Sequence, residues 1–153
     1  MSLKGFMTSV ILGLLLAIVS IWNFRIALYV LGIFYIIKGA LQLINKEYYK
    51  KFQCIINVDR YKAYEKKNDE FKKYIKSDPI SDLIMAFLFI YVGYKANIAA
   101  GSIKYPLMIF LFISIDYLIE TNAMVKSEKW EDYKKKSIFT SIIMIFIVFF
   151  LLK

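Results

Sequence analysis

Three ionisable residues lie inside long apolar stretches of this 153-residue sequence. Asp116 and Glu120 fall one helical turn apart in FISIDYLIETN, and Lys38 falls in GIFYIIKGALQLI. An isolated charge near the centre of a bilayer costs roughly 2.5 to 3.5 kcal/mol on insertion scales, so such residues mark ion pairs or the pathways of protons and ions. This intramembrane charged cluster is therefore the first candidate site.

Catalytic chemistry has little support in the sequence. There is no histidine, and Cys54 is the only cysteine. Within one chain this excludes a Ser-His-Asp triad, a Cys-His dyad, a disulfide and a thiolate zinc site. Because no metal, nucleotide or acid-base motif stands in their place, we expect no enzyme, no cofactor and no metal.

The composition indicates a membrane protein. Hydrophobic residues make up 59% of the chain, and aromatic residues 18%, which is more apolar surface than one small soluble core can bury. The charged residues gather in 45–78 and 126–136, between long apolar runs. Such segregation is what a bilayer requires of a chain that crosses it.

Five apolar runs have about the length of membrane-spanning helices. They cover residues 5–22, 26–44, 80–100, 105–125 and 137–152. The fifth is short, and it can still cross if Lys136 and Lys153 snorkel at its ends. We therefore predict an all-α, polytopic integral membrane helix bundle of about five transmembrane helices built from hairpins, forming a single membrane domain over residues 1–153.

The basic residues predict the orientation. With the N-terminus inside, sixteen Lys and Arg lie on the cytoplasmic side and four, Arg25, Lys95, Lys104 and Lys153, on the other. By the positive-inside rule the N-terminus is cytoplasmic and the C-terminus is outside. The richness in Lys, Ile, Asn, Tyr and Phe suggests a bacterial genome, and hence the bacterial inner membrane.

Residues 46–78 form the basic cytoplasmic loop. Apolar residues at positions 48, 52, 55 and 56 have the spacing of an amphipathic helix, which could continue the second span. Such a helix would either lie on anionic lipid headgroups or connect two spans while packing on a neighbouring helix. Although the net charge is +9, the basic patches flank hydrophobic spans, so we expect lipid and not nucleic acid as the counter-charge.

The depths of the three intramembrane charges predict how they pair. At about 1.5 Å of rise per residue, Asp116 lies about 16 Å, Lys38 about 18 Å and Glu120 about 22 Å from the outer edge. We therefore predict that Lys38 pairs with Asp116 or Glu120. Either the pair only aligns the helices, or Asp116 or Glu120 forms a proton or cation site with Lys38 as its counter-ion. In a third arrangement the fourth span is displaced outward, and both acids lie at the cytoplasmic boundary near Lys126. Asp82 is predicted to complement the N-terminus of the third span.

Small residues recur every four positions in the first span, at Gly5, Ser9, Gly13 and Ala17. This stripe permits close approach of two helix backbones. Two interpretations remain open at this point: close packing within the first hairpin, or formation of a homodimer.

Gly13, followed by Gly32 and Gly39 seven residues apart, also defines a resemblance. Residues 10–45 resemble the hairpin repeat of HdeD-like membrane proteins, a family named for a bacterial acid-resistance protein. The resemblance implies a bundle of such hairpins and an association with acid or envelope stress. It assigns no catalytic or binding role to a residue.

These observations predict a small non-enzymatic membrane protein that acts through helix packing with a partner, as a stress-associated factor, an accessory subunit or an immunity-type protein. The alternative is a proton or cation pathway that uses Asp116, Glu120 and Lys38.

Overall fold

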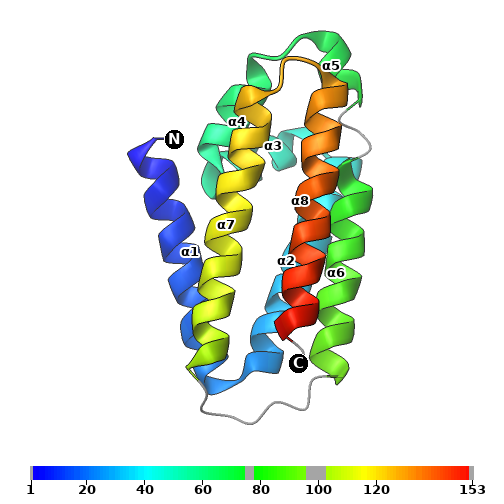
Figure 1. Ribbon diagram of the computed structural model, residues 1–153. Helices are drawn as coiled ribbons and strands as arrows, with labels where there is room; N and C mark the ends of the chain where they lie inside the picture. The colour runs from blue at the N-terminus through cyan, green and yellow to red at the C-terminus, as the bar shows by residue number, and fades with distance from the viewer. Residues whose placement is uncertain (1, 75–77, 96–102, 152–153) are drawn as a thin grey trace.

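The computed structural model describes residues 2–74, 78–95 and 103–151, and within these ranges the chain is helical (Figure 1). Eight helices lie in the described part. Their bounds are α1 Leu3–Trp22, α2 Phe24–Ile44, α3 Lys46–Ile56, α4 Val58–Glu65, α5 Asp69–Tyr74, α6 Asp78–Lys95, α7 Lys104–Lys126 and α8 Trp130–Leu151. The predicted end of the third span, 96–100, lies outside the described residues.

The five long helices α1, α2, α6, α7 and α8 lie side by side and alternate in direction (Figure 1). The short helices α3, α4 and α5 cover one end of this bundle, where α1 begins and α7 connects to α8. Helix α8 ends, at Leu151, at the opposite end of the bundle.

Three of these helices, α1, α2 and α7, are long and apolar enough to cross a membrane. The prediction of a helical protein is confirmed in the described residues, and three of its helices have the length and composition of membrane spans. The other two long helices are more charged. Asp78, Asp82 and Lys95 belong to α6, and the first two turns of α8 carry most of the charges of 126–136.

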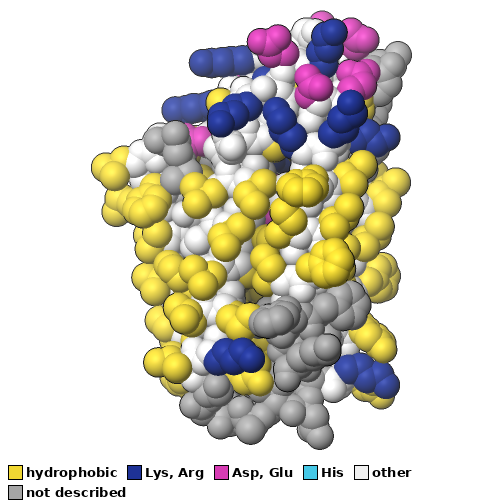
Figure 2. Space-filling view, viewed as in Figure 1, with side chains coloured by type: hydrophobic (Ala, Val, Ile, Leu, Met, Phe, Trp, Pro, Cys, Tyr) yellow, Lys and Arg dark blue, Asp and Glu magenta, His cyan; other side chains and the backbone are white. Residues whose placement is uncertain are grey.

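An apolar surface surrounds the bundle, as expected of helices that face lipid. Large hydrophobic side chains such as Ile11, Ile18 and Ile33 are about half exposed. In Figure 2 they form a wide band, and the charged side chains gather mainly at the end that carries α3 to α5. A soluble monomer rarely exposes a continuous apolar surface of this extent.

Asparagine side chains begin four of the helices. The side chains of Asn23, Asn45, Asn57 and Asn68 accept backbone hydrogen bonds from the first turns of α2, α3, α4 and α5. An asparagine N-cap favours a new helix start at each of these places. The amphipathic helix predicted from positions 48, 52, 55 and 56 is present as α3, but it does not continue the second span, because α2 ends at Ile44. The rest of the described basic segment folds as the separate short helices α4 and α5.

The most extensive helix contacts are those of α2 with α6 and of α1 with α7. Each contact joins a helix of the first predicted hairpin, α1 and α2, to a helix of the second, α6 and α7. The small-residue stripe of α1 is buried. A Cβ atom built on Gly13 would lie 2.9 Å from the Phe110 ring on α7, and one built on Gly5 would overlap the Asp59 carboxylate on α4. The stripe thus serves the α1–α7 contact, and neither packing against α2 nor a homodimer through it matches this arrangement.

Glycines also set the contact between α2 and α6. A Cβ atom on Gly32 would lie 2.7 Å from Ile90, whereas one on Gly39 would lie 3.4 Å from Leu83. From α6, a Cβ atom on Gly93 would lie 2.9 Å from the Tyr29 ring. Small residues on both helices let the backbones approach closely, which aligns the two helices along their whole length.

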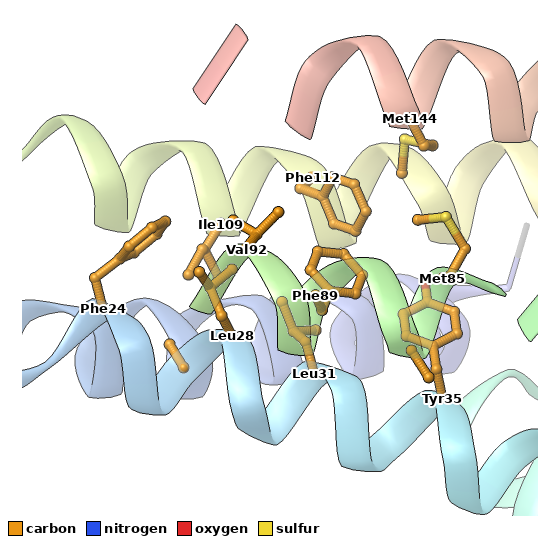
Figure 3. Packing of buried hydrophobic residues seen from close by; sticks show 12 residues of the cluster. Phe24, Leu28, Leu31, Tyr35, Met85, Phe89, Val92, Ile109, Phe112 and Met144 are labelled. Atoms are coloured by element: carbon orange, nitrogen blue, oxygen red, sulfur yellow. The ribbon is translucent and has the colours of Figure 1, made fainter. Parts of the chain in front are cut away.

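Below the charged cluster the bundle is filled by apolar side chains (Figure 3). Rings from two helices meet here, with the centroids of Phe89 and Phe112 5.2 Å apart in an edge-to-face arrangement. The cluster is made up mainly of Phe24, Ala27, Leu28, Leu31, Tyr35, Met85, Ala86, Phe89, Val92, Ile109, Phe112 and Met144. Apart from the Tyr35 hydroxyl, these side chains offer no polar oxygen or nitrogen.

Candidate functional site

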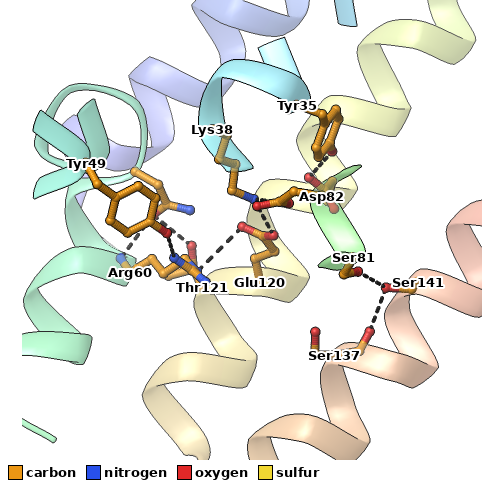
Figure 4. Close-up of polar contacts among 12 residues, drawn as sticks. Tyr35, Lys38, Tyr49, Arg60, Ser81, Asp82, Glu120, Thr121, Ser137 and Ser141 are labelled. Carbon is orange, nitrogen blue, oxygen red and sulfur yellow. Dashed lines mark hydrogen bonds and ion pairs between the residues drawn. The ribbon is translucent and has the colours of Figure 1, made fainter. Parts of the chain in front are cut away.

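Lys38 stands at the centre of the intramembrane site. Its Nζ atom lies 2.9 Å from Oδ1 of Asp82 and 3.0 Å from Oε1 of Glu120 (Figure 4). The residue is only 5% exposed. A buried ammonium group is tolerated when carboxylates take the place of water, and here two helices supply one carboxylate each.

Asp82 therefore has a different role from the one predicted. It binds Lys38 across the α2–α6 contact instead of only complementing the N-terminus of α6. The reason is geometric. Because α6 runs antiparallel to α2 and packs closely along it, the first turns of α6 lie at the depth of the last turns of α2.

Arg60 extends the site toward the short helices at the end of the bundle. From α4 its guanidinium places Nε 3.6 Å from Oε2 of Glu120 and donates hydrogen bonds to the hydroxyls of Tyr49 and Tyr133, at 3.2 and 3.0 Å. Burial raises the pKa of Tyr49, which keeps its hydroxyl protonated. Arg60 is 4% exposed, so this one side chain ties α3, α4, α7 and α8 together in a buried network.

Asp116 lies apart from this ion network. Its Oδ2 atom accepts a hydrogen bond of 2.9 Å from the Tyr35 hydroxyl on α2. Among the described residues, no Lys or Arg lies within ion-pair distance of its carboxyl group. The structure thus brings Lys38 and Glu120 together and leaves Asp116, one turn deeper, with a tyrosine.

Further hydrogen bonds fix the helices around the ion network. Thr121 donates to Oδ1 of Asn57 over 3.1 Å, which joins α7 to the start of α4. The hydroxyls of Ser81 and Ser141 lie 3.3 Å apart and join α6 to α8 (Figure 4). Asn57 thus both caps α4 and anchors it, which positions Arg60 three residues later.

Two cavities border the site. The larger, of about 330 Å³, lies among α1, α2, α3 and α7, and Lys38, Asp116 and Glu120 line one end of it. The smaller, of about 30 Å³, lies among α6, α7 and α8 and also touches Asp116 and Glu120. A volume of this second size has room for about one water molecule.

The site therefore contains two cations and three carboxyl groups: Lys38 and Arg60, with Asp82, Glu120 and Asp116. In the described part of the chain, no three His, Cys, Asp or Glu side chains are grouped so that they could hold a metal ion. Mutual pairing satisfies Lys38, Asp82 and Glu120, which favours a structural tie over a site open to exchange.

Sequence reasoning missed Arg60, Tyr35 and the pairing of Asp82. The sequence held a weak signal for Asp82. Lys38 was paired with an acid at similar depth in the membrane, and a carboxylate in the first turns of an antiparallel span also lies near that depth. No signal singled out Arg60 among the basic residues of its segment or Tyr35 among the twelve tyrosines.

Comparison with known proteins gives no relative. No protein-family model, no curated protein and no solved structure matches this chain. The site must be interpreted from its own geometry.

Matched amide substitutions separate the two intramembrane acids. Glu120→Gln removes the carboxylate shared by Lys38 and Arg60, and we expect a loss of roughly 3 kcal/mol in the free energy of unfolding. Asp116→Asn keeps an acceptor for Tyr35, and we expect a loss of about 1 kcal/mol or less. Reversible unfolding in lipid bicelles measures both, and equal losses would contradict the assigned network.

Proposed function

We propose that this chain is a five-span protein of the bacterial inner membrane, with its N-terminus in the cytoplasm and its C-terminus outside. The alternating directions of α1, α2, α6, α7 and α8 support this arrangement (Figure 1). The described basic segments 46–74 and 126–136 lie at the same end of the bundle, which agrees with the positive-inside rule. Their lysines then face the anionic lipid headgroups of the cytoplasmic leaflet.

Cysteine accessibility tests this orientation. In a Cys54→Ser background, we expect Lys104→Cys to react with a membrane-impermeant maleimide added to intact spheroplasts, because Lys104 begins α7 at the outer end. We expect Lys66→Cys, in the cytoplasmic turn after α4, to react only after permeabilisation. The reverse pattern would contradict the proposed topology.

Within that membrane, we propose that the protein acts without catalysis, by packing against a helix of another membrane protein, as an accessory, immunity-type or stress-associated factor. The observation that carries the proposal is the pairing inside the charged site. Because Lys38 binds Asp82 and Glu120, while Arg60 reaches Glu120, these charges hold helices together and leave recognition to the outer surface.

The surface that fits a partner helix lies on α6. Phe87, Tyr91 and Tyr94 follow one another at helical spacing and are 72%, 59% and 73% exposed. This aromatic stripe differs from the exposed face of α1, which is mainly aliphatic. Aromatic side chains supply much of the binding energy in protein interfaces, and they can pack on another helix within the bilayer.

Site-specific photo-crosslinking in native membranes tests the partner proposal. We expect a photoreactive amino acid at Phe87 to give one discrete cross-linked protein, and the same amino acid at Leu14, an exposed position on α1, to give none. The product's mass distinguishes a second copy of this chain from a different protein. Equal products from both positions, or none from Phe87, would contradict a partner on α6.

A second candidate function is proton or cation transport. It is favoured by the position of Asp116, which lines both cavities and pairs with no Lys or Arg of the described residues. The apolar half of the bundle counts against it. Between the site and the outer end of the bundle lie packed side chains such as Leu28, Leu31 and Phe112 (Figure 3). A conducting path needs polar groups or water through that half.

A flux assay decides between the two candidates. Purified protein in liposomes that contain a pH-sensitive dye is exposed to an imposed pH gradient, and wild type is compared with Asp116→Asn. We expect both to retain the gradient as well as protein-free liposomes do. Dissipation by wild type that Asp116→Asn abolishes, with folding intact, would establish transport and overturn the partner role.

A further inference from the structure

The larger cavity has an apolar part and a polar end. Its apolar walls come from three helices, with Leu12, Leu16 and Val19 on α1, Phe34 on α2 and Ile113 on α7. Its polar end includes Gln53 of α3 together with Lys38, Asp116 and Glu120. The division matches a molecule with a polar head and a hydrocarbon tail.

Hydrogen-bond acceptors are unused at the polar end. Gln53 is 2% exposed, and its Oε1 atom has no hydrogen-bond partner in the described structure. At Asp116 the hydrogen bond from Tyr35 reaches Oδ2 and leaves the second oxygen available. Because a buried polar atom without a partner is costly, a ligand that donates hydrogen bonds here would be stabilised.

The charged residues at the polar end of the cavity determine whether a cationic or an anionic head group fits there. Asp82 and Glu120 already bind Lys38, and Glu120 also faces Arg60. Asp116 is the remaining carboxyl group. A cationic head with N–H donors complements Asp116 and Gln53 together, whereas an anionic head would meet Asp116 and Glu120.

The size of the cavity limits the tail. A cavity of about 330 Å³ has room for about ten groups of water size, since one such group takes up about 30 Å³. We propose that this cavity binds a single-chain amphiphile with a primary ammonium head, placed at Asp116 and Gln53, and an alkyl tail of about ten atoms between α1, α2 and α7. This binding function goes beyond the partner role and does not depend on it.

Photolabelling with competition tests the proposal. The protein in lipid nanodiscs is labelled with a diazirine derivative of decylamine, and the modified peptides are identified by mass spectrometry. We expect labelling of α1 and α2 at the cavity walls. Unlabelled decylamine should compete at a concentration at least tenfold lower than decanoate, with decanol between them.

Variants separate the site from partition into lipid. Leu16→Trp fills the apolar part and should abolish competable labelling, whereas Leu14→Trp, at a position 50% exposed on the same helix, should leave it unchanged. Asp116→Asn should remove the preference for decylamine over decanol, and Gln53→Leu should weaken decylamine at least severalfold. Labelling that decylamine does not compete, or that Leu16→Trp leaves unchanged, would overturn the proposal.

Discussion

The burial of Lys38 is the constraint on which the rest of the structure depends. An ammonium group inside the bundle must have anionic partners, and Asp82 and Glu120 supply them from α6 and α7. Satisfying both contacts fixes the register of three long helices at one depth. Glu120 then reaches Arg60 as well, so the same constraint holds the short helix α4 against the bundle.

The polar groups lie together in one half of the bundle because each buried charge requires a partner at the same depth. Lys38 attracts two acids, Glu120 attracts Arg60, and Arg60 attracts the Tyr49 and Tyr133 hydroxyls. In the other half the described residues include no buried charge, and apolar side chains fill the core there. Among the described residues, the buried charges thus lie together near the end of the bundle that carries α3 to α5.

The sequence predicts the helices well and their neighbours poorly. Hydropathy and charge locate all five long helices to within several residues at the described ends, because those properties are local. The estimate of depth in the membrane predicts the pairing of Lys38 with Glu120, which the structure contains. It does not show that α6, and with it Asp82, packs along α2, because the choice of neighbour depends on side-chain shapes on both helices. The apolar spacing of the basic segment did not reveal its division into separate helices, which follows from the N-caps of Asn45 and Asn57.

Small residues explain why the larger cavity exists where it does. The stripe of α1 brings that helix against α7, and Gly32 brings α2 against α6. Since each helix closes tightly on one neighbour, α1 and α2 cannot also close on each other along the same stretch, and the space between them remains. The space is open along one side, where Leu15 and Val30 are 55% and 41% exposed. Its apolar walls and the unused acceptor of Gln53 are the features that the proposed amphiphile would contact.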